Sequence, residues 1–582
     1  MEQKILDLAK KWIENPLLQE EERQEILKLM QKENKEELTE AFYKDLEFGT
    51  GGMRSLIGIG PNRMNRYTIR RATHALALVI KKNHTQELLK AVISYDSRRM
   101  SQAFAQEAAC VLAGHGFKVF IFNQLNPTPL LSFSIRKLKA HTGIMITASH
   151  NPPNYNGYKA YDQHGCQVVP PLDDEIINTY KTCDDISTIP YQDFSSCLEE
   201  KKIEWVGEEL ENSYLEMLKG FVINPTLCKE QGSHLKIIYT PLHGAGYKLC
   251  PSFLKQIGFC YVTTVPSQDK PDENFTTVEF PNPEDPKAFQ QALILFENEK
   301  ADVAMANDPD ADRLGAFCRH KDQAVFLNGN QMGVLLLHYI LSQLQEKKHL
   351  PTHPLVLKSI VTSELQSVIC QSFKVKVINT LTGFKWMGGK LSELEKLNSP
   401  LHFIFASEES FGYLSHPHAR DKDGINAAAL FCEVALYYKL KNMSLIEALD
   451  SIYETYGFFD EKVIAKTYAG IKGSETINAI MNSFRQYKKE DSFANFTISS
   501  TEDYLLQTGT DKTIPQSDVL GITLNEGSKF FLRPSGTEPK IKFYLMMSEQ
   551  HGTLEQKKKS AQEKIQKIEE QIETILLSVT AH

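Results

Sequence analysis

The sequence predicts an α/β protein of several domains, and three observations support this. The chain has 582 residues, too many for one hydrophobic core, so we expect roughly three to five domains. Short apolar, β-branched segments alternate with helical segments from residue 91 onward, which is typical of layered sheets with mostly parallel strands. This rhythm occurs three times and then ends, so we expect three similar α/β units and a separate C-terminal α+β domain.

The expected elements follow from this alternation. The first unit has strands at residues 91–95, 118–122 and 143–147 and a helix at 102–115. The second has strands at 235–239 and 303–306, and the third has strands at 355–359, 375–378 and 402–406. The C-terminal domain has strand-like segments at 456–467, 529–532 and 541–545 and a charged helix from about 553 to 577.

Residues 1–46 carry apolar side chains at helical spacing among many Glu and Lys residues. We therefore expect an amphipathic helical extension whose role is structural support. Its apolar positions are Ile5, Leu6, Ala9, Trp12, Ile13, Ile26, Leu27 and Met30.

Composition narrows the class of protein. Hydrophobic residues make up 42% and charged residues 24% of the chain, as in a globular protein. The net charge of −8 gives no support for a nucleic acid or an anionic membrane as partner, and we find neither a signal-peptide core nor an apolar run of membrane-spanning length. Ten cysteines without a Cys-x-x-Cys pair predict neither a zinc site nor a redox site, and scattered thiols suit a cytoplasmic location.

The stretch at residues 143–152, Gly-Ile-Met-Ile-Thr-Ala-Ser-His-Asn-Pro, holds the first candidate site. Its apolar start predicts a buried strand, and the Asn151-Pro152 pair prevents a helix from starting there. Ser149 and His150 therefore lie at the carboxyl end of a strand, where a reactant can reach the serine hydroxyl. Alone, this pattern also fits an ordinary loop after a strand.

An acidic loop, Asn-Asp-Pro-Asp-Ala-Asp-Arg, follows the last strand of the second unit. Asp308, Asp310 and Asp312 at alternate positions offer oxygen ligands to a hard cation, and Mg²⁺ is the leading candidate. An EF-hand calcium loop is excluded because Arg313 and Arg319 stand where it needs glycine and glutamate. A solvated acidic turn is disfavoured, since three carboxylates this close repel one another without a cation.

Two further loops carry side chains suited to a polyhydroxylated anion. Residues 406–413, Ala-Ser-Glu-Glu-Ser-Phe-Gly-Tyr, offer carboxylates and hydroxyls to a ligand, but Ser407 suits the N-cap of a helix equally well. Residues 533–540, Arg-Pro-Ser-Gly-Thr-Glu-Pro-Lys, combine a guanidinium, hydroxyls and backbone N–H groups in an anion cradle, although such turns also occur in hairpins. A glycine-rich turn at residues 48–54 is a weaker candidate for a phosphate site.

Together, these motifs resemble those of the α-D-phosphohexomutases. Thr-Ala-Ser-His-Asn-Pro, Asp-x-Asp-x-Asp-Arg, Glu-Glu-Ser and Arg-Pro-Ser-Gly-Thr-Glu-Pro occur in the family's order and spacing, within residues 48–543. Four motifs in register are far more specific than any one of them. Overall, the sequence is most similar to the phosphoglucomutase and phosphopentomutase branch with an N-terminal helical extension.

The resemblance implies four domains around a central cleft: three similar α/β domains with mixed sheets and a C-terminal α+β domain. The corresponding limits are 1–218 for the helical extension and phosphoserine domain, 219–327 for the metal-binding domain, 328–453 for the sugar-binding domain and 454–582 for the phosphate-binding domain. It further implies an isomerase that interconverts glucose 1-phosphate and glucose 6-phosphate through a phosphoserine. Glucose 1,6-bisphosphate would be the intermediate and activator, and the partner would be a small sugar phosphate.

Family roles carry over to matching residues. Ser149 corresponds to the phosphoserine and would hold Mg²⁺ together with Asp308, Asp310 and Asp312. The catalytic group also includes His150, Arg54, Lys159, Arg313 and Lys422. The substrate-binding group comprises Thr382, Gly383, Lys385, Glu408, Ser410, Arg420, Arg533, Ser535, Gly536 and Thr537. A lysine could act as a base only if its pKa were lowered, and Arg313 is better suited to stabilising charge than to moving protons.

The sequence departs from the family pattern in three loops. Ser407 replaces the glycine that usually precedes Glu-Glu-Ser, Pro309 and Ala311 replace the glycines between the aspartates, and Gly51 replaces a serine. In this family, the loop that contains Ser407 binds the sugar. Glucose phosphates are therefore the expected substrates, and the replacement leaves other sugar phosphates as alternatives. The alternatives are ribose or deoxyribose phosphates in a phosphopentomutase, mannose phosphates in a phosphomannomutase, and a sugar-bisphosphate synthase.

Other classes fit the motifs less well. A serine hydrolase would need the Gly-x-Ser-x-Gly elbow, which is absent around Ser149, and adjacent serine and histidine side chains do not readily form a nucleophile–base pair. A phosphatase of the haloacid dehalogenase type would use Asp-x-Asp as nucleophile and leave the serine and cradle motifs unused. A sugar-phosphate-binding protein without catalysis is disfavoured by the intact serine, aspartates and cradle.

Overall fold

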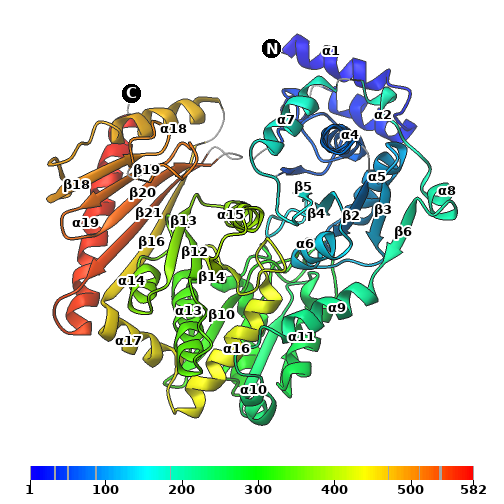
Figure 1. The fold of residues 1–582 in the computed structure, drawn as a ribbon. Coiled ribbons are helices and arrows are strands. Elements are labelled where there is room, and N and C mark those ends of the chain that lie inside the picture. Colours follow the sequence, from blue (N-terminus) through cyan, green and yellow to red (C-terminus); the bar gives the residue numbers. More distant parts are fainter. Residues whose placement is uncertain are drawn as a thin grey trace. The chain divides into compact units, whose positions relative to one another are not determined.

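The computed structural model describes residues 2–31, 34–48, 52–85, 88–183, 185–468, 471–509, 511–535 and 540–580 (Figure 1). The chain divides into two compact units. Unit 1 comprises Met1–Phe317, Met387–Ser399 and Gly412–Leu436, and unit 2 comprises Cys318–Trp386, Pro400–Phe411 and Tyr437–His582. Within the described residues, no helix is both long and apolar enough to cross a membrane.

The N-terminal extension in unit 1 is helical, as predicted. Its helices are α1 (Glu2–Ile13), α2 (Glu20–Leu29) and α3 (Lys35–Phe42). Their apolar faces form a core of their own, in which Ile5, Ala9, Ile26 and Phe42 are buried. Leu27 shares the predicted apolar spacing but is 45% exposed, because it lies on the outer side of α2.

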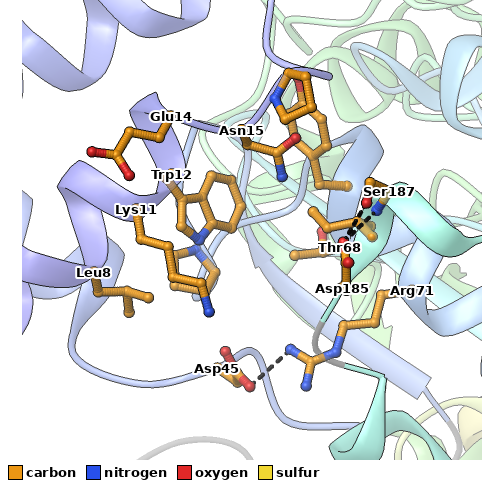
Figure 2. A pocket seen from close by; sticks show the side chains of 14 residues that line it. Leu8, Lys11, Trp12, Glu14, Asn15, Asp45, Thr68, Arg71, Asp185 and Ser187 are labelled. Carbon is orange, nitrogen blue, oxygen red and sulfur yellow. Dashed lines mark hydrogen bonds and ion pairs between the residues drawn. The ribbon is translucent and has the colours of Figure 1, made fainter.

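A cavity of about 620 Å³ lies between the extension and the start of the next helix, α4 (Arg66–Asn83) (Figure 2). The indole of Trp12 forms part of its wall and meets the rings of Phe42 and Tyr67 edge-on, with ring centroids 5.8 Å and 5.6 Å away. Beside it, Arg71 on α4 donates to Asp45 at 2.8 Å. The extension therefore packs on α4 through the Trp12–Tyr67 ring contact together with the ion pair between Glu22 and Arg66 at 2.7 Å.

The first sheet of unit 1 has the strand order β1-β5-β4-β2-β3-β6. The β2–β3, β2–β4 and β3–β6 pairs are parallel, whereas the β4–β5 and β1–β5 pairs are antiparallel. The strands are β1 (Gly52–Leu56), β2 (Lys90–Tyr95), β3 (Lys118–Phe122), β4 (Thr142–Ile146), β5 (Tyr155–Asp162) and β6 (Ile203–Val206). The accompanying helices are α5 (Ser101–Gly114), α6 (Thr128–Lys137), α7 (Leu172–Thr182) and α8 (Phe194–Glu199).

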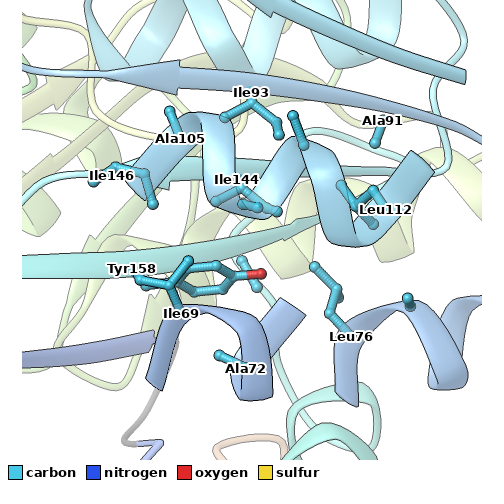
Figure 3. Packing of buried hydrophobic residues seen from close by; sticks show 14 of the residues in the cluster. Ile69, Ala72, Leu76, Ala91, Ile93, Ala105, Leu112, Ile144, Ile146 and Tyr158 are labelled. Atoms are coloured by element: carbon cyan, nitrogen blue, oxygen red, sulfur yellow. The ribbon is translucent and has the colours of Figure 1, made fainter. Parts of the chain in front are cut away.

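Small and branched side chains fill the core between this sheet and its helices (Figure 3). Alanines on α4 and α5 let the helices lie close to the strands, and isoleucines from β2 and β4 fill the space between them. The residues shown in this core are Ile69, Ala72, Leu76, Ala91, Ile93, Ala105, Leu112, Ile144, Ile146 and Tyr158.

The second predicted unit also has parallel strands, because β7 pairs in parallel with both β8 and β9 in unit 1. Its strands are β7 (Lys236–Thr240), β8 (Tyr261–Thr264), β9 (Val303–Ala306), β10 (Gly315–His320) and β11 (Gln323–Leu327). Its helices are α9 (Glu208–Lys219), α10 (Pro225–Gln231), α11 (Gly246–Ile257) and α12 (Gln290–Asn298). The predicted strand at 303–306 matches β9.

In unit 2, β12 pairs in parallel with β13 and β14, as predicted for the third α/β unit. The strands are β12 (Pro354–Ser359), β13 (Lys376–Thr380) and β14 (His402–Glu408), followed in unit 1 by β15 (Gly412–Leu414). The helices of this part of the chain are α13 (Gly329–Glu346), α14 (Leu365–Ser372), α15 (Phe384–Lys396), α16 (Gly424–Leu440) and α17 (Leu445–Tyr456).

The strand β14 ends two residues later than predicted. Ser407 and Glu408 therefore belong to a strand, and the interpretation of Ser407 as a helix N-cap is wrong. Pairing explains the extension, since Ser407 lies opposite Lys358 on β12 and continues the ladder.

The C-terminal part of unit 2 is the predicted α+β domain. Its sheet has the order β16-β21-β20-β19-β18-β17, with antiparallel neighbours throughout. The strands are β16 (Phe458–Thr467), β17 (Ser492–Phe493), β18 (Phe496–Asp503), β19 (Leu520–Leu524), β20 (Lys529–Pro534) and β21 (Lys540–Glu549), and the helices are α18 (Ile471–Phe484) and α19 (Leu554–Thr580). The long helix α19 lies along this sheet and buries Ala561, Ile568 and Ile572 (Figure 1).

Candidate active site

Ser149 stands three residues after the end of β4, and its side chain is buried. Its φ is 51°, in the left-handed region that serine rarely adopts. The backbone N–H of Ser149 donates to Thr147 Oγ1 at 2.8 Å, and that hydroxyl donates to Asp96 Oδ2 at 2.6 Å. The predicted nucleophile is thus fixed by the loop itself and by the residue that follows β2.

Arg98 holds the same loop from inside unit 1. Its buried guanidinium donates to the carbonyl oxygens of Ser149, of Asn151 at 2.5 Å and of Pro152 at 2.7 Å. It also pairs with Asp96 at 3.3 Å. Burial lowers the pKa of Arg98 to about 10, so the side chain keeps its charge at neutral pH. Because one cation binds three carbonyl groups of the turn, the turn has little freedom to change shape.

The acidic loop brings its three carboxylates together in unit 1. Ligand oxygens of Asp308, Asp310 and Asp312 lie within 4.8 Å of one another, and all three side chains are buried. Ser149 Oγ donates to Asp308 Oδ2 at 2.6 Å, which joins the serine motif to the acidic motif. Among the described residues, Asp310 Oδ1 and Asp312 Oδ1 are buried without a hydrogen-bond partner. Buried carboxylate oxygens of this kind suit a hard cation, so the loop fits a metal ion.

The backbone of this loop is held by its neighbours. Ala245 N–H donates to the carbonyl of Pro309 at 2.8 Å, and a Cβ added at Gly244 would lie only 2.4 Å from Pro309 Cα. Ala311, which replaces a family glycine, has a φ of 51° and is therefore strained. Asn307 accepts from Tyr239 Oη at 2.8 Å. The replacements Pro309 and Ala311 are thus accommodated within a tightly bonded loop.

Two of the carboxylates differ in their pKa. Burial and the neighbouring Asp312 and Asp310 carboxylates raise the pKa of Asp308 well above its ordinary value. Burial also favours the neutral form of Asp310, but the Lys159 ammonium outweighs it and holds the pKa of Asp310 below its ordinary value. The loop is therefore short of positive charge on the Asp308 side.

Three predicted cations surround the acidic loop. Lys159 on β5 lies 2.8 Å from Asp310 Oδ2, and Lys422 Nζ lies 3.0 Å from Asp312 Oδ2. Arg313 pairs with Glu284, while its Nε lies 3.9 Å from carboxylate oxygens of Asp308 and Asp312.

The carboxylates near Lys159 also determine its protonation state. Although burial opposes the charge on Lys159, Asp310 and Asp312 raise its pKa above the ordinary value. Lys159 therefore does not meet the condition of a lowered pKa that we set for a lysine base.

Tyrosines position the loop that carries Lys422. The carboxylate of Asp421 accepts from Tyr161 Oη at 2.8 Å, and Asp423 accepts from Tyr214 Oη at 2.7 Å. These carboxylates and tyrosines are buried in unit 1. Lys422 is therefore held between two anchored neighbours beside the acidic loop.

His150 and Arg54 lie close to the serine. His150 Nδ1 is 3.3 Å from Ser149 Oγ, so the two adjacent side chains are in contact. The hydroxyl proton has a shorter acceptor in Asp308, and burial followed by the charge of Arg313 lowers the pKa of His150 well below its ordinary value. Arg54 on β1 donates to Asn151 Oδ1 at 2.8 Å, in the turn that follows the serine.

In unit 2, Glu408 joins two of the predicted sugar-binding segments. Its Oε1 accepts a hydrogen bond from the backbone N–H of Gly383 at 2.6 Å. Gly383 has a φ of 112°, which other residues rarely adopt. Lys385 is buried, and its ammonium lies 4.8 Å from the centroid of the Trp386 ring. Thr382 Oγ1 is buried without a hydrogen-bond partner among the described residues, and Ser410 is partly exposed.

Arg420 and the cradle loop complete the predicted substrate group. In unit 1, Arg420 donates to Glu395 at 2.9 Å and to the carbonyl of Pro417, and burial together with the charge of Arg136 lowers its pKa to about 10. In unit 2, Arg533 stands opposite Lys542 in the β20–β21 ladder, and Ser535 N–H donates to the carbonyl of Lys540 at 2.7 Å. Gly536 and Thr537 of the cradle, and Gly51 of the glycine-rich turn, lie outside the described residues.

Comparison with known proteins agrees with this arrangement. The chain matches the phosphoglucomutase/phosphomannomutase α/β/α domain I over residues 45–186, domain II over 212–321 and domain III over 328–456. A phosphoglucomutase of Staphylococcus saprophyticus is 35% identical over 524 residues, which cover 88% of this chain and 93% of the relative. The chain belongs to the α-D-phosphohexomutase family.

Two further comparisons describe the same relationship. A phosphoglucomutase of Staphylococcus aureus is 36% identical over 536 residues, covering 88% of this chain and 91% of the relative. The open form of parafusin, a phosphoglucomutase from Paramecium, has a TM-score of 0.66 with 18% identity and covers 91% of this chain and 96% of that one. This second likeness shows the fold.

Membership confirms several predictions at once. The fold has three α/β domains of this family and a C-terminal domain with an antiparallel sheet. The chain is an isomerase of the phosphohexomutase class, which acts on sugar phosphates. The family implies a metal ion, and the buried oxygens of Asp308, Asp310 and Asp312 fit one.

The sequence did not reveal several residues that build the site. They are Asp96, Arg98, Thr128, Tyr161, Tyr214 and Glu284, of which Thr128 donates to Asp310 Oδ2 at 2.8 Å. Asp96 and Arg98 were open to prediction, since they directly follow β2, and carboxyl ends of parallel strands share one edge of a sheet. The sequence gives no comparable indication for Tyr161 and Tyr214, because only the tertiary fold brings their hydroxyls to Asp421 and Asp423.

Proposed function

We propose that this isomerase is a phosphoglucomutase that interconverts glucose 1-phosphate and glucose 6-phosphate. The observation that carries the proposal is the hydroxyl of Ser149, held 2.6 Å from Asp308 at the edge of a buried carboxylate cluster. The curated relatives of similar length named phosphoglucomutase support glucose as the sugar.

The proposed reaction passes one phosphoryl group in each direction. The P–O bond to Ser149 breaks while a P–O bond to a sugar hydroxyl forms, and the hydroxyl proton leaves for a base. The resulting glucose 1,6-bisphosphate turns around, and the P–O bond at its other phosphorylated position breaks while a P–O bond to Ser149 Oγ forms. The proton taken up in the first transfer returns to the sugar oxygen that is set free, which releases the isomer. Mg²⁺ held by Asp308, Asp310, Asp312 and the serine phosphate would neutralise charge on the transferring group.

The cations of unit 1 stabilise the anionic group during transfer. Lys159 and Arg313 carry raised pKa values, so they act as fixed positive charges. Lys422 approaches the same carboxylates and Arg54 approaches the serine turn. His150, with its lowered pKa, is a neutral hydrogen-bonding neighbour of the serine.

The remaining predicted residues recognise the sugar and its second phosphate. In this proposal Glu408 and Ser410 bind sugar hydroxyls, together with Thr382, Gly383, Lys385 and Arg420. Arg533, Ser535, Gly536 and Thr537 bind the phosphate that does not react. We retain the domain limits 1–218, 219–327, 328–453 and 454–582 as part of the proposal.

We place the reaction in the cytoplasm, with a small sugar phosphate as partner and no role for nucleic acid or membranes. All ten cysteines are free thiols, which suits a reducing compartment.

The test compares kcat/KM for glucose 1-phosphate, mannose 1-phosphate and ribose 1-phosphate, with Mg²⁺ and a trace of the matching bisphosphate. We expect a preference for glucose 1-phosphate of at least about tenfold. A preference for ribose 1-phosphate would overturn the proposal in favour of a phosphopentomutase, and one for mannose 1-phosphate in favour of a phosphomannomutase. Turnover of none of the three, with transfer from a glycolytic phosphoryl donor to glucose 1-phosphate, would identify a bisphosphate synthase.

A further inference from the structure

The side chain of Ser407 points into unit 2 and away from solvent. It is 1% exposed, and its hydroxyl donates to Gln366 Oε1 on α14 at 2.9 Å. Gln366 is itself fully buried. The residue that departs from the family pattern therefore bonds to a glutamine inside the domain, so any effect of Ser407 on the sugar is indirect.

A glycine on α13 makes room for this pair. A Cβ added at Gly333 would lie 2.7 Å from Gln366 Nε2 and 3.4 Å from Ser407 Oγ. Since the first distance is too short for a real contact, a side chain at position 333 would force the Gln366 amide to shift from its place beside Ser407. The three residues form one packed set from α13, α14 and β14, which we call the Ser407 latch.

The two residues after Ser407 are tied to other elements. Glu408 accepts from the Gly383 N–H at 2.6 Å, and Glu409 accepts from Ser359 Oγ, at the end of β12, at 3.0 Å. Glu408 is the last residue of β14 and Glu409 follows it directly, so these bonds restrain both the end of the strand and the start of the turn. A shift of Ser407 would therefore move Glu408, the proposed sugar ligand.

The latch keeps a polar group in the core at a cost in stability. Gln366 Nε2 is buried without a hydrogen-bond partner among the described residues. An unsatisfied buried donor is destabilising, and an apolar side chain of the same shape would avoid the penalty. With glycine at position 407, both ends of the Gln366 amide would lack a partner, so Ser407 and Gln366 depend on each other.

We propose that Gln366 and Gly333 are positioning residues that set the sugar preference of this isomerase through Ser407. They place the backbone of Glu408 and Ser410 without touching the sugar. The inference rests on the proposed function, because it takes the Glu408 loop as the sugar site.

The experiment measures kcat and KM separately for glucose 1-phosphate and ribose 1-phosphate in Gln366→Met, Ser407→Gly and the double variant. We expect each single change to raise KM for glucose 1-phosphate about fivefold and to lower the glucose-to-ribose ratio of kcat/KM, with kcat within about twofold. The double variant should recover most of the ratio, since it removes the buried amide together with its partner. Gly333→Ala, which keeps both polar partners, should move the ratio in the same direction as the single changes.

The control is Ser372→Ala, which removes another helix hydroxyl of α14, bonded to the carbonyl of Ile369 at 2.8 Å. It should leave the ratio unchanged, and phosphorylation of Ser149, followed by intact-mass spectrometry, should persist in every variant. The inference is wrong if the single variants and Gly333→Ala keep the wild-type ratio, or if the two changes act additively. Failure of the proposed function would instead be seen in the wild-type protein, as an absent preference for glucose 1-phosphate.

Discussion

The Asp308–Asp312 loop of unit 1 follows a parallel strand and the Ser407–Ser410 segment of unit 2 spans the end of one, yet they are built differently. The first is held by full charges, with lysines 2.8 Å and 3.0 Å from its carboxylates. The second is held mostly by hydrogen bonds to a backbone N–H, a hydroxyl and an amide. Charged side chains thus surround the loop where a phosphoryl group would be transferred. Uncharged hydrogen-bonding groups hold the segment that would bind the hydroxyl groups of the sugar.

Two carboxylates, Asp310 of unit 1 and Glu461 of unit 2, have pKa values that are shifted in opposite directions. In unit 1, Lys159 holds the pKa of Asp310 below its ordinary value despite burial. In unit 2, burial raises the pKa of Glu461 to about 7, because its nearby cation is outweighed. The Lys159 ammonium, 2.8 Å away, therefore keeps Asp310 ionised, whereas no cation near Glu461 outweighs its burial.

The largest expected effect is that of Ser149→Ala. This change removes the proposed phosphoryl carrier, so kcat should fall by at least about 10³-fold. Intact-mass spectrometry should show no phosphorylated protein.

The matching change in unit 2, Ser410→Ala, sharpens the comparison. It should raise KM and leave the phosphoserine in place, since it removes only a proposed sugar contact. If the Ser149→Ala protein still carried a phosphate and converted substrate, unit 1 would not be the centre of phosphoryl transfer.

Asp310→Asn should come next, with a loss of about 10²-fold in kcat. The same variant should lose the rise in Tm that MgCl₂ gives the wild-type protein, because a ligand that binds only the folded state stabilises it by about 2.7 kcal/mol at 100 times its Kd. Asp322→Asn in an exposed turn of unit 2 is the control and should keep both the activity and the rise in Tm. An unchanged Mg²⁺ response in Asp310→Asn would refute the metal site.

Tyr214→Phe tests whether Lys422 depends on its anchored neighbour. Loss of the 2.7 Å hydrogen bond to Asp423 should lower kcat about tenfold and leave KM within about twofold, because only the position of a charge near the reacting group changes. Tyr180→Phe removes a buried hydroxyl that has no hydrogen-bond partner in the described part of the chain, and it should have no such effect. Equal kinetics for the two variants would show that Lys422 needs no support from Tyr214.

The smallest effect concerns stability and pH. Because burial raises the pKa of Glu461 from 4.5 to about 7, the folded state binds a proton that the unfolded state releases. This contribution is complete below about pH 4.5 and is lost as the pH rises through 7. Glu461→Gln should therefore match the wild type at pH 4.5 and exceed it by about 1 kcal/mol at pH 8, a modest value since the side chain is partly exposed.

Urea unfolding at both pH values measures this difference in the free energy of unfolding. A constant difference between the variant and the wild type at both pH values would contradict the expectation.

The sequence predicted the parts of the fold and site that depend on local pattern. The strands at 118–122 and 303–306 match β3 and β9, since short apolar runs between turns specify a buried strand. Ser149 and the aspartates were recognised because their motifs are contiguous. The place of Arg98 after β2 indicates the correct edge of the sheet, but nothing near it in the chain shows that it will reach the carbonyl of Pro152. The sequence shows that Ser407 departs from the family pattern, but it does not reveal Gln366, which only tertiary packing brings to Ser407.

The left-handed backbone of Ser149 also limits which nucleophile this position can accept over evolution. Threonine offers the same hydroxyl, and the two residues often exchange freely where only that group matters. At a φ of 51°, however, a β-branched side chain is a genuine outlier. Backbone geometry therefore disfavours the exchange of Ser149 for threonine, although it looks the most conservative one. We expect relatives that keep this backbone to keep serine, even though the chemistry would allow either alcohol.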